Sequence, residues 1–599
     1  MTALPPPSLI RDGAVFRSDT FDDIYYQPED GLAETQHVFV NGNDLPDRFA
    51  RLEAGDHFVI GELGFGTGLN LLCTMEAFAA AAKRGAQLHY VAGEGFPLSQ
   101  SQAREALSAI AARWPALKPH ADALGTAYPP PRPGLAQLWL SPNVTLTLSF
   151  GPVTEALADL DGQVDAWFLD GFSPAKNPDM WAPEVLARVG DLTRPGGTFA
   201  TFTVAGAVRR ALADARFSPE KAPGFGKKRD MLRGQKLSGR PADRSPEHIA
   251  IIGAGIAGAA LAHQLTRLGR KVTIVEANAP GAGASGNPIG LLMPRIDAQD
   301  TPAARFYRDA FLFAHRFYAA AVPNAIDIYG GELEAVSGTP DRFEKALSNG
   351  LWDAEDLRLQ DTGSAFVPSG ATLRPGEAIA HLIDGLVMVE QAVLQVREQT
   401  DGVILVMADG SEVAADIAVW TNGAALSAHQ AFEGDVIPSR GQLDLFAAPR
   451  PGRIKTRGHY VAPYGEGLAV GATYDPWALE DEVTTSADSL EANREAALSL
   501  LGETPINHLR GRASLRATTK DRHPVAGPLP ASPGKEAGDY RAKQWGIGGL
   551  GSRGLSTGPF LAAHLAQIFV GGISPLSPAG QKLIEPSRFA ARRARRASS

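Results

Sequence analysis

Three glycines and an acid near the middle of the chain have the types and spacing of a dinucleotide-binding turn. Gly253, Gly255 and Gly258 follow a short apolar run, and Glu276 ends a second apolar run after an alanine-rich stretch. In such a unit the first glycine permits a tight turn, the second lets the backbone approach a pyrophosphate, and the third lets the helix pack on the strand. Glu276 would accept hydrogen bonds from ribose hydroxyls. An ordinary glycine-rich turn is the alternative, but strand, helix and acid all stand where the mechanism needs them, so residues 249–277 predict a dinucleotide-binding βαβ unit.

A second glycine-rich turn lies near residue 60 and differs in its chemistry. The apolar run HFVIGEL passes into GFGTGLNLLCTMEAF, and a later strand, LHYVAG, ends on an acid. The turn lacks the Lys-Ser/Thr pair of a phosphate-binding P-loop, and an acid two residues before the first glycine suits a ligand that carries an ammonium group. We therefore expect an S-adenosylmethionine site lined by Glu62, Gly64, Gly66, Gly68 and Glu94.

A third acid follows a buried strand in the same half of the chain. Residues 164–169 predict a strand that delivers Asp170 to its carboxyl end, where ligands of open α/β sheets bind. The loop DGFSPAKNPDMW that begins there holds aromatic residues and rigid proline turns. The structural alternative is that Asp170 caps the next helix. The functional hypothesis is that it faces the methyl donor and accepts hydrogen bonds, or a proton, from an amine substrate.

These motifs together resemble a known family. ELGFGTGLN, GEGFPL and DGFSPAKNPDMW are similar to the methyltransferase half of the bacterial bifunctional tRNA 5-methylaminomethyl-2-thiouridine biosynthesis proteins, and the likeness extends over both halves of the chain. The resemblance implies that Asp170 is the catalytic acid–base residue and that the first glycine turn and its acids line the S-adenosylmethionine site. One departure is Gly151-Pro152, where the family carries Gly-Asp. A contact to the adenine side would then be lost or made by a neighbouring residue.

Later runs resemble flavin oxidases of the glycine oxidase and D-amino-acid oxidase group. GRASLRATTKDRHPVAGP is similar to the Arg-Pro-Gly-Thr-Lys-Asp run of that group, so Arg516 would hold a substrate carboxylate through its planar fork. WGIGGLGSRGLSTGP precedes a final helix, and its backbone N–H groups would serve the O2 and N1 side of the flavin. A structural ion pair is the alternative for both arginines of these runs, and His523 is interpreted as structural. The flavin contacts predicted from the second run are Gly549, Arg553, Gly554 and Leu555.

Two strand–loop–helix–strand–acid units in one chain predict a fusion of two α/β domains. We expect residues 1–240 to form a Rossmann-like S-adenosylmethionine-dependent methyltransferase domain. Residues 247–599 would form an FAD-binding Rossmann-type domain that resembles D-amino-acid oxidase, with an α+β substrate cap from residues 300–374 and 438–512. A glycine-rich, basic run near 221–246 is typical of a linker, and a contact to tRNA phosphates is its alternative function.

The composition limits the possible partners and the compartment. The chain has 599 residues and a net charge of −9, so any nucleic-acid contact must come from a local patch rather than from global charge. Cys73 is the only cysteine, which excludes an intrachain disulfide and a cysteine-rich metal site and fits the reducing cytoplasm. Because it lies outside the flavin half, FAD would be bound non-covalently. We expect no bound metal and no membrane span, and the basic tail, residues 587–599, predicts disorder.

The resemblance implies two consecutive reactions on one amine. The oxidoreductase half would remove the carboxymethyl group from 5-carboxymethylaminomethyl-(2-thio)uridine at the tRNA wobble position, U34, and the methyltransferase half would methylate the aminomethyl group that remains. Arg516 would hold the carboxylate, and Asp170 would deprotonate and orient the amine. Two alternatives stay open. One is a fused small-molecule amino-acid oxidase and amine N-methyltransferase, and the other is a non-catalytic RNA-binding module that kept both cofactor folds.

Overall fold

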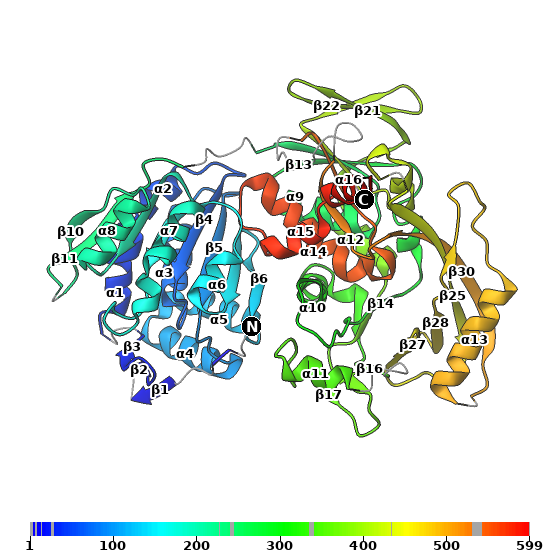
Figure 1. Cartoon of the computed structure of the whole chain (residues 1–599), viewed down its shortest axis with the longest axis horizontal. Coiled ribbons are helices and arrows are strands. Elements are labelled where there is room, and N and C mark those ends of the chain that lie inside the picture. The colour runs from blue at the N-terminus through cyan, green and yellow to red at the C-terminus, as the bar shows by residue number, and fades with distance from the viewer. Residues whose placement is uncertain are drawn as a thin grey trace.

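Two α/β bodies lie side by side in this computed structural model (Figure 1). The chain starts in the body drawn in blue and cyan and ends in the body drawn in green to red. This mixed architecture agrees with the two α/β units predicted from the sequence, whereas the domain boundaries at 1–240 and 247–599 stay predictions. The structure describes residues 4–5, 9–12, 15–25, 29–226, 228–239, 245–334, 341–432, 434–502, 504–529 and 542–597.

The first body is organised around a sheet with parallel central strands. Within the described residues the sheet has eight strands, in the order β10-β11-β9-β8-β4-β5-β7-β6. β4 pairs in parallel with both β5 and β8, so the carboxyl ends of these strands meet at one edge, where ligands of such sheets bind. The bounds are β4 (His57–Leu63), β5 (Gln87–Glu94), β6 (Gly134–Ser141), β7 (Val144–Phe150), β8 (Val164–Leu169), β9 (Thr193–Thr201), β10 (Glu220–Pro223) and β11 (Asp230–Gln235).

Helices close both faces of this sheet. Successive side chains of a strand point to opposite faces, so in β8 Phe168 enters the apolar core on the side of α3 and Trp167 enters the core on the side of α7. Leu72 of α3 and Leu186 of α7 are fully buried in these two cores. The bounds are α2 (Leu45–Ala50), α3 (Leu69–Ala81), α4 (Gln100–Arg113), α5 (Lys118–Ala127), α6 (Val153–Ala158), α7 (Pro183–Leu192) and α8 (Gly206–Asp214).

A small antiparallel sheet precedes this body. Its strands are β1 (Leu9–Asp12), β2 (Val15–Ser18) and β3 (Asp23–Ile24), and β2 pairs with both neighbours. The chain then continues through α1 (Gly31–Thr35) and the π-helix η1 (Gln36–Asn41).

The basic run near 221–246, predicted as a linker, is in part structured. It supplies β10 and β11 to the first sheet, where β11 pairs with β9 and buries Leu232 completely. Lys228 forms an ion pair with Glu34 at 2.8 Å, and Lys227 lies outside the described residues. The interpretation as a linker is therefore wrong for β10 and β11, because β11 buries Met231 and Leu232 and pairs with strands on both sides.

The second body contains a largely parallel sheet of the predicted dinucleotide-binding type. In the described part of the chain it has six strands, in the order β20-β13-β12-β24-β32-β31. α9 and α14 pack together on one face, and the β21-β22-β23 sheet covers the other. The bounds are β12 (His248–Ile252), α9 (Ile256–Arg267), β13 (Lys271–Glu276), β20 (Val387–Glu390), β21 (Val393–Gln399), β22 (Gly402–Met407), β23 (Glu412–Ala415), β24 (Ile417–Trp420), β31 (Val525–Pro528), β32 (Gln544–Gly548) and α14 (Gly554–Val570).

A separate mixed sheet forms a cap beside the dinucleotide-binding sheet (Figure 1). Its longest pair is β25 with β30, and β30 extends beyond the predicted limit at residue 512. The bounds are α10 (Pro302–Ala321), α11 (Arg342–Ser348), α12 (Pro375–Leu382), α13 (Ala487–Leu501), β14 (Gly290–Leu292), β15 (Ile326–Ile328), β16 (Gly331–Leu333), β17 (Arg358–Leu359), β18 (Ala365–Val367), β19 (Ala371–Leu373), β25 (Val436–Ala447), β26 (Ile454–Arg457), β27 (His459–Tyr464), β28 (Gly467–Gly471), β29 (Asp475–Pro476) and β30 (Asn507–Thr519).

The two bodies meet along the edge strand β6. Arg308 of α10 is 2% exposed and donates to the Pro133 carbonyl at 2.8 Å, and Arg267 of α9 donates to the Ser141 carbonyl at 2.7 Å. The Trp139 ring packs edge-on against Phe313 of α10. Since an uncovered edge strand is a site for unwanted pairing, these contacts also protect β6.

The C-terminal tail is helical rather than disordered as predicted. Residues 587–597 form α16, and Arg588 and Arg592 pair with Asp521 at 3.0 and 2.9 Å, while Arg593 pairs with Asp435. The prediction failed because the acids that neutralise the helix lie far away in the sequence. Ser598 and Ser599 lie outside the described residues.

Candidate active sites

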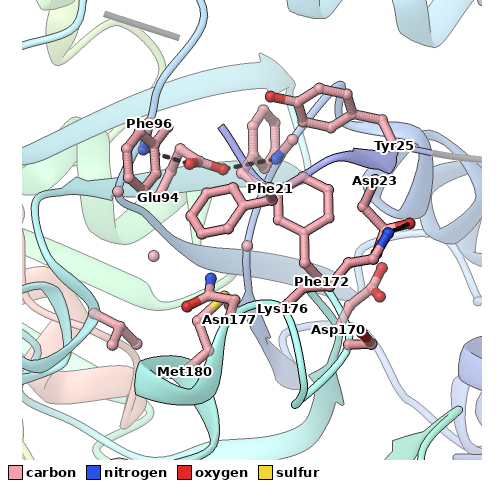
Figure 2. A pocket seen from close by; sticks show the side chains of 18 of the residues that line it. Phe21, Asp23, Tyr25, Glu94, Phe96, Asp170, Phe172, Lys176, Asn177 and Met180 are labelled. Atoms are coloured by element: carbon pink, nitrogen blue, oxygen red, sulfur yellow. Dashed lines mark hydrogen bonds and ion pairs between the residues drawn. The ribbon is translucent and has the colours of Figure 1, made fainter. Parts of the chain in front are cut away.

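A cavity of about 860 Å³ opens at the carboxyl ends of β4, β5 and β8. The glycine-rich turn after β4 borders it, together with the acid at the end of β5 and the loop that follows β8 (Figure 2). Four of the predicted site residues line this cavity: Gly64, Gly66, Glu94 and Asp170. The sheet thus brings three segments from distant parts of the chain to one edge, as the strand order requires.

The turn after β4 needs glycine for its backbone conformation. Gly64, Gly66 and Gly68 have φ values of 81°, 53° and 83°, in the left-handed region that side chains disfavour. Gly68 is the N-cap residue just before α3, and it is absent from the cavity lining. Gly68 therefore shapes the turn, whereas Gly64 and Gly66 also face the cavity.

Glu94 ties the turn to β5. Its carboxylate accepts hydrogen bonds from the backbone N–H of Gly66 at 2.8 Å and of Phe96 at 2.7 Å. Burial raises the pKa of Glu94, and the backbone N–H groups oppose that rise. Each carboxylate oxygen keeps further acceptor capacity toward the cavity, which fits the predicted hydrogen bonds from ribose hydroxyls.

Asp170 belongs to a chain of buried polar groups that the sequence did not reveal. The Asn70 side-chain amide donates to Asp170 Oδ2 and to Glu62 Oε1, each at 2.7 Å. Asn70 Oδ1 in turn accepts from the Thr35 hydroxyl at 2.9 Å, which fixes the amide orientation. Burial raises the pKa of Asp170 to about 6. A carboxyl group with this pKa is suited to accept a proton near neutral pH.

Glu62 does not contact the cavity as predicted. It is 1% exposed, it is absent from the cavity lining, and Asn70 lies between it and Asp170. Burial, with Asp170 as the second cause, raises the pKa of Glu62 well above its usual range. The direct contact to a ligand ammonium is therefore replaced by an indirect role, in which Glu62 helps to orient Asn70.

The departure at Gly151-Pro152 leaves an apolar wall. Pro152, Val153 and Thr154 line the cavity at the start of α6, where the family's aspartate would supply a carboxylate. An adenine in this part of the cavity would meet the Pro152 ring and the backbone, so whether the contact is lost or made by a neighbouring residue stays a prediction.

The turn after β12 has the geometry that a dinucleotide requires. Gly253 has φ of 109°, and a Cβ atom there would lie 2.8 Å from the Thr421 carbonyl oxygen. A Cβ atom on Gly258 would overlap the Gly253 carbonyl, so the third glycine permits the close contact of α9 with the turn. At Gly255 the nearest atom to an added Cβ is Ser285 Oγ at 3.4 Å, which leaves the approach for a ligand. The three glycines thus fit the pyrophosphate of FAD.

Glu276 at the end of β13 repeats the arrangement of Glu94. Its carboxylate accepts from the backbone N–H of Ala254 at 2.7 Å and of Asn278 at 3.0 Å. The two acids therefore each hold the glycine turn of their own domain, and their contacts to a ribose stay predictions.

The predicted flavin contacts lie together where α14 begins. Gly549 has φ of 63°, and Gly554 is the first residue of α14, whose N-terminal N–H groups would face the flavin. The Leu555 carbonyl accepts a hydrogen bond from the Tyr318 hydroxyl at 2.9 Å, which fixes the backbone at this position. Arg553 is beside Tyr307, and burial lowers its pKa.

Arg516 lies on β30 without a carboxylate partner among the described residues. Its Nη1 donates to the Thr473 carbonyl at 3.3 Å, and its guanidinium carbon lies 6.0 Å from the Tyr474 ring centroid. A Cβ atom on Gly441 of β25 would lie 2.5 Å from Arg516 Nη2, so glycine there makes room for the guanidinium. Burial lowers the pKa of Arg516. A half-buried guanidinium without a carboxylate partner is suited to bind a substrate carboxylate.

The sequence interpretation missed a second arginine on β30. Arg512 Nη2 donates to the carbonyls of Ala282 and Gly283 at 2.8 and 2.9 Å, and Nη1 donates to Asn287 Oδ1 at 2.8 Å. It joins the cap to the small-residue loop after Glu276. The signal was present, since residues four apart on a strand share a face and Arg512 therefore lies on the face of Arg516.

The described residues show neither a metal-binding cluster nor a membrane-spanning helix. In those ranges no group of three or more His, Cys, Asp or Glu residues could hold a metal ion, and no helix is long and apolar enough to cross a membrane. Cys73 is buried on α3 in the first body, where burial raises the pKa of its thiol, and it is remote from the flavin-binding sheet.

Comparisons with known proteins match both halves of the chain. Residues 115–237 match the model of an S-adenosyl-L-methionine-dependent methyltransferase family, and residues 248–568 match that of FAD dependent oxidoreductases. Among solved structures, iminodiacetate oxidase from Chelativorans sp. BNC1 covers 56% of this chain and 99% of its own, at 22% identity and a TM-score of 0.47. Glycine oxidase from Geobacillus kaustophilus covers 56% and 98%, at 21% identity and a TM-score of 0.46.

Similar sequences extend over nearly the whole chain. The tRNA 5-methylaminomethyl-2-thiouridine biosynthesis bifunctional protein MnmC of Chromohalobacter salexigens is 36% identical and covers 94% of this chain and 90% of its own length. The protein of the same name from Caulobacter vibrioides is 36% identical and covers 98% of both. The chain therefore belongs to the family of tRNA 5-methylaminomethyl-2-thiouridine biosynthesis bifunctional proteins, with a methyltransferase domain that uses S-adenosylmethionine followed by an FAD-dependent oxidoreductase domain.

Proposed function

We propose that this protein converts 5-carboxymethylaminomethyl-(2-thio)uridine at the wobble position of tRNA into the 5-methylaminomethyl form in two steps. The oxidoreductase domain removes the carboxymethyl group, and the methyltransferase domain methylates the amine that remains. The observation that supports this proposal is that each domain holds one charged side chain suited to its step of the reaction. Arg516 is a half-buried cation that forms no ion pair with a carboxylate among the described residues, and Asp170 is a carboxylate with a raised pKa at the edge of the donor cavity.

In the first step Arg516 binds the carboxylate of the N-carboxymethyl group. Its planar fork fixes the carbon between carboxylate and nitrogen relative to the start of α14, where the backbone N–H groups lie. Bound FAD would supply the acceptor for a hydride from that carbon. Hydrolysis of the resulting C=N bond adds water across it, releases glyoxylate and leaves a primary amine on the RNA.

Asp170 acts in the second step, on that amine. An alkylammonium has no free lone pair, so it must lose a proton before it can attack the sulfonium methyl group. Asp170 accepts this proton and, through its hydrogen bond with Asn70, keeps a fixed orientation toward the donor cavity. The N–C bond to the methyl group forms as the S–C bond breaks, and the sulfonium becomes a neutral thioether.

The functional residues and the domain limits belong to the same proposal. We assign Asp170 and Arg516 to substrate, and Gly64, Gly66, Gly68 and Glu94 to the S-adenosylmethionine site. The residues assigned to FAD are Gly253, Gly255, Gly258, Glu276, Gly549, Arg553, Gly554 and Leu555. Residues 1–240 and 247–599 are the units that carry the two activities. The single buried cysteine and the tRNA substrate support a cytoplasmic protein without a resident metal.

The test uses purified protein and tRNA that lacks the final modification. With FAD alone the carboxymethyl group should be lost and glyoxylate released, and addition of S-adenosylmethionine should then give the methylaminomethyl nucleoside. Asp170→Asn should stop at the aminomethyl form, and Arg516→Ala should leave the carboxymethyl form. Turnover of free amino acids with no reaction on tRNA would favour the fused small-molecule enzyme instead.

A further inference from the structure

Residues 19–25 form a strap over the donor cavity that the reactions described above do not use. The strap follows β2, contains β3 and ends at Tyr25, and Phe21, Asp23 and Tyr25 line the cavity (Figure 2). It belongs to the small N-terminal sheet rather than to the main sheet. The cavity is therefore completed by a segment that carries none of the predicted site residues.

Aromatic rings from the strap meet the loop after Asp170. The Phe21 ring lies 4.8 Å from the Phe172 ring at an interplanar angle of 30°, and Tyr25 packs edge-on against Phe172 at 5.6 Å. Phe96, which follows the end of β5, meets Phe21 edge-on at 5.1 Å. We call Phe21, Tyr25, Phe96 and Phe172 the aromatic wall. All four rings line the cavity, and Phe172 stands two residues after Asp170 (Figure 2).

A polar contact joins the strap to the same loop. Lys176 Nζ donates to the Asp22 carbonyl and lies 3.6 Å from Asp23 Oδ1. Because Asp170, Phe172 and Lys176 share one loop, this contact fixes the position of the strap, and with it the Phe21 ring, relative to the Asp170 carboxylate. The strap is therefore positioned by the loop that carries the proton acceptor.

We propose that Phe21 and Phe172 form the face on which the pyrimidine ring of the target nucleoside stacks, with its C5 substituent directed to Asp170. This inference rests on the proposed function. A base that is modified by an enzyme has to leave its stack, and an aromatic face replaces the stacking that it loses. Phenylalanine rings offer no hydrogen bond to the base edge, so the wall recognises a planar ring and leaves selection of the amine to Asp170.

In this arrangement the donor lies against the glycine turn and Glu94, and the pyrimidine lies against the Phe21 and Phe172 rings. Gly64, Gly66 and Glu94 provide the backbone turn and the carboxylate that suit the donor's ribose and amino-acid parts. Substitution of Phe21 should therefore weaken RNA binding and leave donor binding unchanged. Since Phe21 is only half-buried, its truncation leaves both apolar cores of the domain intact.

The test compares two RNA stem-loops with two forms of the full-length protein. One anticodon stem-loop carries 5-aminomethyluridine at the wobble position and the other has an abasic site there, and both are titrated in the presence of S-adenosylhomocysteine. Wild-type protein should bind the first about tenfold more tightly than the second. Phe21→Ala should remove that difference, whereas Phe21→Tyr should keep it.

The control is Asp19→Ala, which alters an exposed residue of the same strap and should preserve the tenfold difference. Equal weakening of both RNAs in Phe21→Ala would place the wall against the RNA backbone and overturn the proposal. So would an unchanged difference, equal binding of both RNAs by the wild type, or weaker binding of S-adenosylhomocysteine by Phe21→Ala. Methylation of aminomethyl-tRNA by the wild-type protein is measured separately. If methylation occurs but the binding difference does not, this inference fails and the proposed function stands; if no methylation occurs, the proposed function fails.

Discussion

Replacement of Asn70 with alanine should move the pH dependence of methyl transfer. One amide group of Asn70 donates to both Asp170 and Glu62, each at 2.7 Å, in a region where burial already raises the pKa of both carboxyl groups. The variant removes this donor and leaves the two acids facing each other. Both effects disfavour the ionised form of Asp170, which is the form that accepts a proton.

The size of the change follows from the hydrogen bond that is lost. A hydrogen bond to a charged group contributes about 1.5–3 kcal/mol, and one pKa unit corresponds to about 1.4 kcal/mol, so the pKa of Asp170 should rise by roughly 1–2 units. Starting from about 6 in the wild type, the variant should titrate at roughly 7–8. At pH 7 the ionised fraction then falls from about nine-tenths to between about one-tenth and one-half.

Single-turnover methylation of aminomethyl-tRNA, measured from about pH 5 to about pH 9, tests this expected pKa change. The rate of Asn70→Ala should be about two- to tenfold low at pH 7 and should approach the wild-type rate at high pH. Asn177→Ala is the matched control, because Asn177 lines the same cavity and makes no side-chain hydrogen bond to Asp170 among the described contacts. An unshifted profile with a lower plateau would refute the reasoning and make Asn70 a structural residue only.

Three further variants test other parts of the sites. Asp170→Asn should abolish methylation and should raise the free energy of unfolding at pH 7 by up to about 3 kcal/mol. The reason is that the pKa of Asp170 is higher in the folded protein than in the unfolded chain, so the folded protein binds more protons. The contribution of Asp170 to stability therefore falls as the pH rises from about 4 to about 6. Calorimetry at pH 4 and pH 7 measures the gain, and an equal gain at both would contradict it. Arg516→Lys should raise KM for oxidation with a normal flavin spectrum, since a point charge cannot replace the planar fork; wild-type kinetics would remove Arg516 from the site. Glu276→Ala should weaken FAD binding, measured by flavin fluorescence, while methylation proceeds at the normal rate; parallel loss of both activities in folded protein would argue against two independent sites.

Local patterns in the sequence were sufficient for the two cofactor turns. The spacing of Gly253, Gly255 and Gly258 reflects backbone approach within a single βαβ unit, so it is visible in a stretch of under about 30 residues. Glu94 and Glu276 were predictable for the same reason, because each ends the second strand of its unit. The structure confirms their place at the glycine turns, whereas their contacts to bound cofactors stay predictions.

Contacts between distant segments were beyond the reach of these patterns. Asn70 meets Asp170 across 100 residues of chain, and nothing in the periodicity of α3 distinguishes it from a helix residue in solvent. Glu62 was misassigned because its place before the turn resembles that of a ligand-binding acid, although the strand directs its carboxylate to Asn70. The tail at 587–597 was misjudged because Asp521, which neutralises it, lies on another element.

The charges of the two sites impose an order on the two reactions under the proposed function. The carboxymethyl form of the substrate carries a carboxylate, which Arg516 attracts and which Asp170 repels when it is ionised, above its pKa of about 6. Loss of the carboxymethyl group reverses this preference, because the product is a cationic amine with nothing for Arg516 to bind. The same amine meets a carboxylate with a pKa of about 6 in the methyltransferase site. Oxidation therefore precedes methylation by the electrostatics of the two sites, without any need for the RNA to pass directly from one to the other.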